Sequence, residues 1–198
     1  MMLDKLDSSM VLPDGFTAVK YIQSSGNQYI DTGRKLTQDS DISIVFDLID
    51  TYNSSGNFGI FGSRESVRKN NLTLFYDADG AGDYLYIDFS EGIEHRHNEY
   101  FPNHRIKIRV NKSGVWVNNI LKKSWSDVTD FETPTNGLIF DIGNDWAGKK
   151  AIMRLYIYTD GDAQRLVPCL DVDGVPCLYD LIGRTALYNQ GSGSFTWG

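Results

Sequence analysis

Alternation of apolar and polar residues is the feature that most constrains the fold of this chain. Residues 105–110 read RIKIRV, so that each basic residue is followed by an apolar one. Residues 42–48 (ISIVFDL) and 72–76 (LTLFY) follow nearly the same rule. Because successive side chains of a β-strand point to opposite sides, a period of two is typical of strands with one buried and one solvent-facing side. The chain is therefore expected to consist largely of half-buried strands.

Turn-forming residues divide the rest of the chain into further short apolar segments. Clusters such as 53–56 (NSSG), 77–80 (DADG) and 111–114 (NKSG) combine Asn, Asp, Ser and Gly, which favour turns. A short helical turn near 124–131, capped by Ser126 or Asp127, is the one helical segment that the pattern allows. The further expected strands are 57–61, 83–89, 115–121, 138–142, 151–158 and 166–170.

Many short strands with polar sides favour an all-β protein made of two stacked antiparallel sheets. The 198 residues suit one domain, and 21 of the 26 acidic residues are Asp, which prefers turns to helix interiors.

A net charge of −7 without a basic stripe argues against nucleic acid as a partner. Residues 1–12 lack the pattern of a signal peptide, and no apolar run is long enough to span a membrane. We therefore expect either a soluble product that is made in the cytoplasm or a fragment of a longer protein.

The two cysteines, Cys169 and Cys177, flank an Asp173-Gly174 turn that would pair 166–170 with 175–179 as a hairpin. A two-residue turn would place Cys169 opposite Leu178, and a three-residue turn would place it opposite Cys177. A disulfide therefore depends on the register, and cytoplasmic synthesis favours reduced, half-buried thiols instead.

The two ends of the chain carry recognisable motifs. Residues 12–33 read LPDGFTAVKYIQSSGNQYIDTG, and residues 154–198 read RLYIYTDGDAQRLVPCLDVDGVPCLYDLIGRTALYNQGSGSFTWG. Both resemble the corresponding parts of a family of concanavalin A-like, laminin-G-type jelly-roll domains that occurs in phage structural proteins and in bacterial surface proteins. The chain departs from that family at Cys177, where a small residue such as glycine is more common.

The resemblance implies a jelly-roll sandwich over residues 12–198, preceded by an N-terminal arm at 1–11. It implies a sandwich of the fourteen-strand class, in which the first and last strands lie near each other. In this arrangement the segment 21–33 is a corner, with Tyr21 and Tyr29 packing inwards.

Some relatives of this sandwich hydrolyse polysaccharides with two carboxylates on one strand face, about 5 Å apart in retaining enzymes. Such pairs are usually Glu, whereas this chain has five Glu and no Glu-x-Asp-x-Glu motif. It also lacks a Gly-x-Ser-x-Gly nucleophile elbow. We therefore expect a protein that is not an enzyme and needs no organic cofactor.

Calcium is the first metal that the sequence suggests. Asp77, Asp79 and Asp83 surround a Gly-rich turn and offer the hard oxygen ligands that Ca²⁺ prefers, although an ordinary Asp/Gly hairpin tip is the favoured explanation. His95 and His97 would share one side of a strand and could bind a transition metal, with a polar loop as the alternative.

Carbohydrate binding needs exposed aromatic rings beside planar polar groups. Trp116 lies between Val115 and Val117, so it should face solvent if the valines are buried, and Asn118 follows it. A second group is formed by Asn144, Asp145 and Trp146 in a Gly-rich loop. Packing in the core or at its edge is the alternative for each aromatic residue, and Tyr84, Tyr86 and Trp125 are further candidates.

These observations together favour a non-catalytic module of a phage virion, in the tail, the baseplate or a capsid decoration, that binds host-surface carbohydrate. The alternatives are a purely structural assembly module that contacts other virion proteins and a fragment of a bacterial surface adhesin. Neither nucleic acid nor a membrane is expected as a partner, and homo-oligomerisation stays open.

Overall fold

A computed structural model gives the fold of the chain and describes residues 11–49, 56–66, 69–78, 83–98, 104–143 and 149–198. These residues form eighteen β-strands and contain no helix, which confirms the predicted all-β class. The strands are β1 (Thr17–Ala18), β2 (Ile22–Gln23), β3 (Ile30–Thr37), β4 (Ile42–Leu48), β5 (Gly56–Ser63), β6 (Leu72–Ala78), β7 (Asp83–Phe89), β8 (Ile93–His97), β9 (Ile106–Asn111), β10 (Gly114–Val117), β11 (Ile120–Ser124), β12 (Glu132–Ile139), β13 (Lys149–Lys150), β14 (Met153–Asp160), β15 (Gln164–Leu170), β16 (Pro176–Asp180), β17 (Thr185–Leu187) and β18 (Thr196–Trp197).

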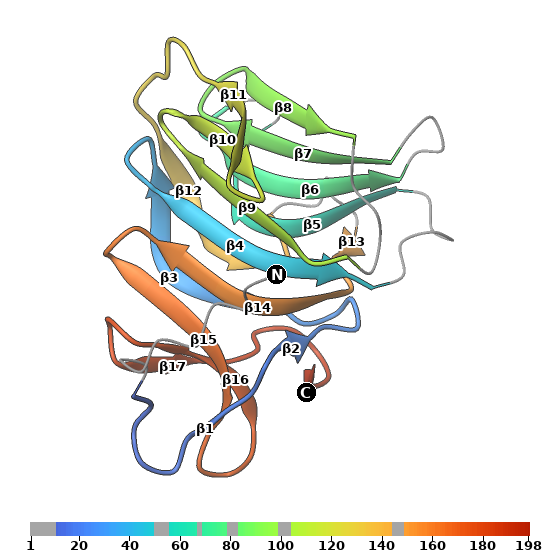
Figure 1. Cartoon of the computed structure of the whole chain (residues 1–198), viewed down its shortest axis with the longest axis vertical. Coiled ribbons are helices and arrows are strands. Elements are labelled where there is room, and N and C mark those ends of the chain that lie inside the picture. The colour runs from blue at the N-terminus through green and yellow to red at the C-terminus, as the bar shows by residue number, and fades with distance from the viewer. Residues whose placement is uncertain (1–10, 50–55, 67–68, 79–82, 99–103, 144–148) are drawn as a thin grey trace.

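The strands form two sheets that pack face to face as a sandwich (Figure 1). The main path of the eleven-stranded sheet runs β11-β10-β9-β4-β14-β15-β16-β17, while β1, β2 and β18 join it beside β15 and β14. The seven-stranded sheet runs β3-β12-β5-β6-β7-β8, and β13 pairs with β5. Apart from the parallel pair β13 and β5, the strands of the described residues pair antiparallel. The predicted two-sheet antiparallel sandwich is therefore confirmed, and its form is consistent with a jelly roll.

The core lies between the sheets and follows from the alternation in the sequence. In β9 and β4, Ile108 pairs with Ile44 and Ile106 with Phe46, and all four side chains are buried. Full burial of such a side chain contributes about 1.5–3 kcal/mol relative to leaving it in water. The intervening polar residues must then point away from the seven-stranded sheet. We call this side the outer face of the eleven-stranded sheet.

The N- and C-terminal parts of the described chain meet in one sheet. The strand β2 lies between β14 and β18, with Ile22 opposite both Leu155 and Trp197. The expected proximity of the first and last strands is therefore confirmed. The prediction that Tyr21 packs inwards is wrong: Ile22 is the buried residue, and the alternation turns Tyr21 outwards. Tyr29 is partly buried against the core, as expected.

The hairpin of β15 and β16 carries a second hydrophobic cluster. Cys169 and Cys177 are directly opposite each other, as in the three-residue-turn alternative. Both thiols are free, and both residues are fully buried rather than half-buried. Leu12 and Phe16 pack against this cluster from the segment that precedes β2. Apart from Val11, the arm expected at 1–11 lies outside the described residues.

Two local predictions are wrong: the single strand expected at 115–121 and the helical turn expected at 124–131. The segment 115–121 is two strands, β10 and β11, joined by a tight turn in which Asn118 and Asn119 have φ values of 50° and 66°. The segment 124–131 is not helical: Ser124 ends β11, and residues 125–131 form an irregular connection to β12.

Candidate functional site

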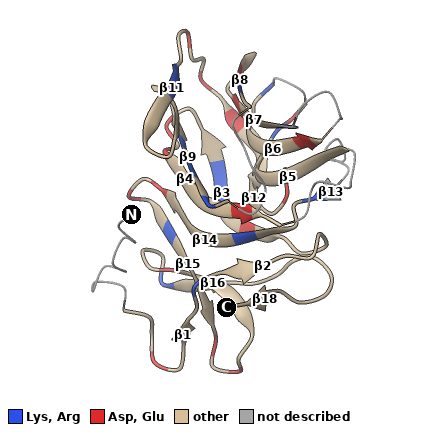
Figure 2. Ribbon diagram, turned by 45° about the vertical axis from the view of Figure 1, so that its right-hand side comes forward, with Lys and Arg blue, Asp and Glu red and all other residues tan. Residues whose placement is uncertain are grey.

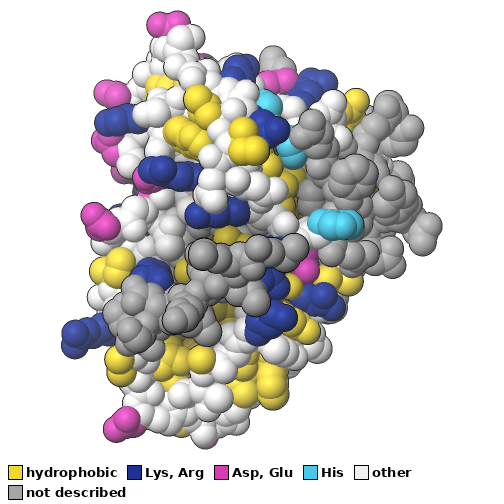
Figure 3. Space-filling view, viewed as in Figure 1, with side chains coloured by type: hydrophobic (Ala, Val, Ile, Leu, Met, Phe, Trp, Pro, Cys, Tyr) yellow, Lys and Arg dark blue, Asp and Glu magenta, His cyan; other side chains and the backbone are white. Residues whose placement is uncertain are grey.

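The outer face of the eleven-stranded sheet gathers aromatic and charged side chains. The strand β9 and the residue before it direct Arg105, Lys107 and Arg109 to this face, because the residues between them are in the core. Figure 3 shows basic side chains near the middle of this side of the molecule. Acidic residues are instead frequent in turns, such as the turn between β15 and β16 in Figure 2.

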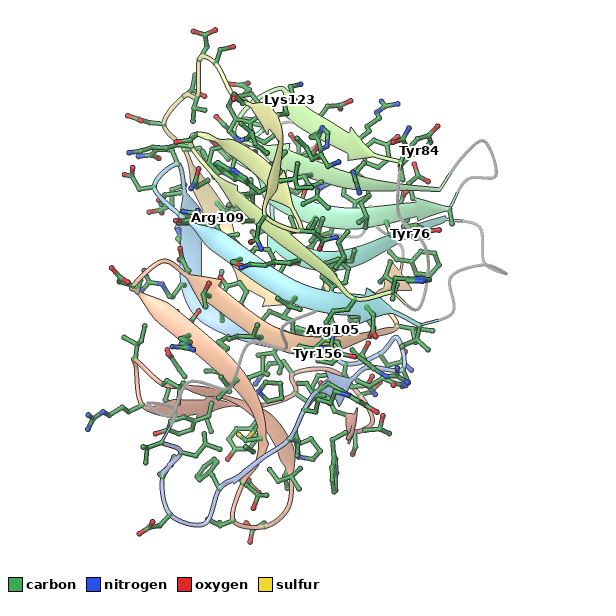
Figure 4. The ribbon with its side chains drawn as sticks, in the orientation of Figure 1. Tyr76, Tyr84, Arg105, Arg109, Lys123 and Tyr156 are labelled. Carbon is green, nitrogen blue, oxygen red and sulfur yellow. The ribbon has the colours of Figure 1, made fainter. Side chains whose placement is uncertain are left out.

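Arg105 and Tyr156 form the centre of one cluster on this face (Figure 4). The guanidinium carbon of Arg105 lies 3.6 Å from the centroid of the Tyr156 ring. Tyr21 contacts the same ring edge-on, with 5.7 Å between the centroids, and Arg154 lies 4.9 Å from the Tyr21 ring. Cations and aromatic rings therefore alternate across the surface, an arrangement favoured by attraction between a cation and the ring quadrupole. We call these four residues the Arg105–Tyr156 cluster.

Asp47 of β4 lies beneath this cluster. Its side chain is only 7% exposed, and its Oδ2 accepts a hydrogen bond of 2.9 Å from the Tyr156 hydroxyl. A guanidinium nitrogen of Arg154 lies 3.9 Å from the same oxygen. Oδ1 has no hydrogen-bond partner within the described chain. Burial raises the pKa of Tyr156, the hydrogen bond to Asp47 raises it further, and Arg105 lowers it. Tyr156 is therefore a hydrogen-bond donor at neutral pH.

A second cluster surrounds Trp116. Arg109 donates to both carboxylate oxygens of Asp41, at 2.8 Å and 2.7 Å, and its guanidinium carbon lies 5.2 Å from the centroid of the Trp116 ring. Asn111 donates a third hydrogen bond to Asp41, of 3.1 Å. The hydrogen bonds from Arg109 lower the pKa of Asp41, against an opposing effect of burial, and raise the pKa of Arg109. We call this group the Arg109–Trp116 cluster.

The structure places part of the predicted carbohydrate site on this face. Val115 and Val117 are buried and Trp116 is partly exposed, which confirms its predicted direction. Asn118 is exposed in the turn after β10, where its Oδ1 accepts from the backbone N–H of Lys107. The other predicted group, Asn144, Asp145 and Trp146, lies outside the described residues. The nearest strands before and after it, β12 and β13, belong to the seven-stranded sheet, not to the sheet that carries Trp116.

The remaining aromatic candidates pack against neighbouring side chains, and Tyr84 and Tyr86 keep part of their surface exposed. Trp125 stacks on Phe89 at the edge of the core. On the outer side of the seven-stranded sheet, the Tyr86 ring is stacked on Phe75. The guanidinium of Arg96 also lies over the Tyr86 ring, so Phe75 and Arg96 both cover part of it. Tyr84, labelled in Figure 4, is partly exposed and meets Tyr86 edge-on.

The predicted metal ligands are only partly described. Asp77 lies in β6 and pairs with Tyr84 of the antiparallel β7, as expected for a hairpin. Asp79 and the side chain of Asp83 lie outside the described part of the chain. His95 and His97 share one side of β8, with ring centroids 6.3 Å apart. The described residues contain no group of three or more His, Cys, Asp or Glu side chains placed to hold a metal ion.

The sequence did not point to Asp47, Tyr156 or Arg105, because these residues meet only through the pairing of β4, β9 and β14. The one available signal was that polar and aromatic residues occupy the alternate positions of three strands.

No helix of the described residues is long and apolar enough to cross a membrane. Neither the known protein-family models nor the curated proteins include a match to this chain, so its class is defined by fold and site: a β-sandwich with an aromatic, cationic sheet face.

Proposed function

We propose that the protein is a non-catalytic recognition module that binds carbohydrate on the outer face of the eleven-stranded sheet. The observation that carries this proposal is the pair of clusters, each with a guanidinium packed on an aromatic ring. Arg105 and Arg109 are four positions apart, which corresponds to about 14 Å along a strand. An extended oligosaccharide could contact both clusters at once.

Together the two clusters offer the two kinds of contact that sugars need. Arg105 lies on the Tyr156 ring, which keeps its planar fork of N–H donors in a fixed orientation, so less entropy is lost when it binds a hydroxyl oxygen. The partly exposed ring of Trp116 supplies apolar surface for the C–H face of a sugar. Asn118 adds an exposed amide next to Trp116.

The carboxylates of this face support binding rather than hydrolysis. A glycosidase needs one carboxyl group that carries a proton near neutral pH. Asp41 is held ionised by Arg109, because this contact lowers its pKa. Asp47 is buried beneath Tyr156 and accepts a hydrogen bond from its hydroxyl.

The resemblance of residues 12–33 and 154–198 to phage structural domains extends the proposal to a place on a virion, with a bacterial surface as the alternative. Mass spectrometry of purified particles tests this part separately. Detection of the chain in particles that carry the known tail and capsid proteins is the expected result, and its absence from them would contradict a virion location.

A second candidate is an assembly module that contacts other proteins. The observation that favours it is the edge strand β11, where Ile120 is 62% exposed and Leu121 is 48% exposed. A double Ile120→Ser, Leu121→Ser variant should then lose its place in the particle while it keeps its fold. Normal incorporation of this variant would exclude β11 as the contact.

A glycan array followed by titration calorimetry with host cell-wall polysaccharide tests the binding proposal. Trp116→Ala should weaken binding about tenfold, by analogy with the roughly 1–3 kcal/mol that a nucleic-acid base gains by stacking on an aromatic side chain. Tyr84→Ala, on the other sheet, is the matched control and should leave binding unchanged. Absence of binding across the array at high protein concentration would overturn the proposal.

A further inference from the structure

The charge that β9 and the residue before it bring to the outer face is opposite to that of the whole chain. The protein has a net charge of −7, whereas the residues of this face in and next to β9 are Arg105, Lys107 and Arg109. Alternate residues of a strand are about 7 Å apart, so the three cations form a short row. Figure 3 shows basic side chains near the middle of the same face.

Only part of this positive charge is neutralised within the described chain. Arg109 is paired with Asp41, and Arg154 lies near Asp47. Arg105 forms no ion pair among the described residues, and its main contact is the Tyr156 ring. Lys107 likewise has no acidic partner there. Its neighbours on either side are Val45 of β4, in register with it, and Asn118, which bonds its backbone.

We propose that the carbohydrate is acidic and that its carboxylate or phosphate group binds between Arg105 and Lys107. This inference rests on the proposed function and names the chemical class of its ligand. Arg105 is suited to bidentate binding of such a group, because Tyr156 fixes the plane of its guanidinium. Lys107 adds a second charge without an acidic neighbour to compete for it.

Calorimetry with three polymers tests this class. Polygalacturonate carries carboxylates, its fully methyl-esterified form has the same backbone without charge, and poly(glycerol phosphate) carries phosphates. We expect at least one acidic polymer to bind ten times more tightly than the ester, with an affinity that falls as salt rises. Comparison of the two acidic polymers then distinguishes a carboxylate from a phosphate ligand.

Variants locate the anion. Lys107→Gln and Arg105→Gln should each weaken binding of the acidic polymer about fivefold, the upper range for an exposed ion pair. Lys112→Gln is the control, because this lysine is 65% exposed in the turn after β9 and pairs with Asp39. Circular dichroism establishes that the variants are folded.

Each outcome has a separate meaning. If neither polygalacturonate nor poly(glycerol phosphate) binds more tightly than the methyl ester, the acidic class is overturned and the proposed carbohydrate function is left standing. Failure to bind these polymers and a panel of neutral glycans would overturn both. If the acidic polymer binds and neither Lys107→Gln nor Arg105→Gln weakens its binding, the anion does not bind at this face.

Discussion

Cys169 and Cys177 face each other across β15 and β16, with their sulfur atoms 3.4 Å apart and both residues fully buried. Directly paired residues of neighbouring strands have Cβ atoms close enough for a disulfide after a small adjustment. We predict that oxidative refolding with oxidised glutathione links them and lowers the mass by about two hydrogens. The link should raise the free energy of unfolding by about 2–3 kcal/mol, since it closes a short loop. A Cys169→Ala variant should show neither change, and a persistent count of two free thiols after oxidative refolding would contradict the prediction.

Loss of the Tyr156 hydroxyl should destabilise the fold. Tyr156→Phe removes the hydrogen bond to the buried Asp47 carboxylate, and such a loss costs about 1–3 kcal/mol. Urea denaturation of the two single variants and the double variant with Asp47→Ala measures the coupling. The tyrosine change should cost much less in the Asp47→Ala background, and equal costs in both backgrounds would show that the hydroxyl acts independently of Asp47.

Gly62 of β5 should not tolerate a side chain. Its φ is 135°, and a Cβ atom there would lie 2.2 Å from the carbonyl oxygen of Leu72. Gly62→Ala should therefore cost about 3 kcal/mol or more, because steric overlap adds to backbone strain. Gly92 has φ 71° but open space around it, so Gly92→Ala should cost only about 1–2 kcal/mol. Thermal melts of the two variants measure this difference, and similar melting temperatures would refute the steric argument.

The pair of Asp41 and Arg109 should make stability depend on pH in the acid range. The folded-state pKa of Asp41 is lowered, so the contribution of the pair is fully present above the unfolded pKa of about 3.9 and is lost as the pH falls through the folded pKa. Because the pair is partly exposed, the contribution is about 0.2–1 kcal/mol. The stability difference between wild type and Asp41→Asn should therefore be constant above about pH 5 and shrink below it. A difference that grows towards low pH would have the wrong sign for this pair.

The sequence predicted the strands whose alternation is unbroken. In β9 every second residue is buried, and Trp116 was placed correctly because both neighbouring valines are in the core. The same rule fails in β14, where a strict period of two would put Tyr156 and Tyr158 on one side. A bulge between Leu155 and Ile157 interrupts the register, so Tyr158 is fully buried while Tyr156 faces outwards. A single unpaired residue of this kind leaves no clear trace in the sequence.

The site itself was less predictable than the fold. Asp47, Arg105 and Tyr156 come from three strands that are far apart in the sequence, and their contact depends on which strands become neighbours. Alternation indicates on which side of its strand each residue lies, but it does not indicate which residues of different strands meet on one surface. Long-range strand pairing therefore decides the chemistry of this face.

The insertion of β2 between β14 and β18 has a consequence for how the chain can fold during synthesis. Trp197 pairs with Ile22, so a strand that is synthesised late completes the pairing of a strand that is synthesised early. Until β18 has been made, β2 keeps an open hydrogen-bonding edge, which is a template for pairing with other chains. The sheet therefore becomes complete only with β18, after its central strands have been synthesised.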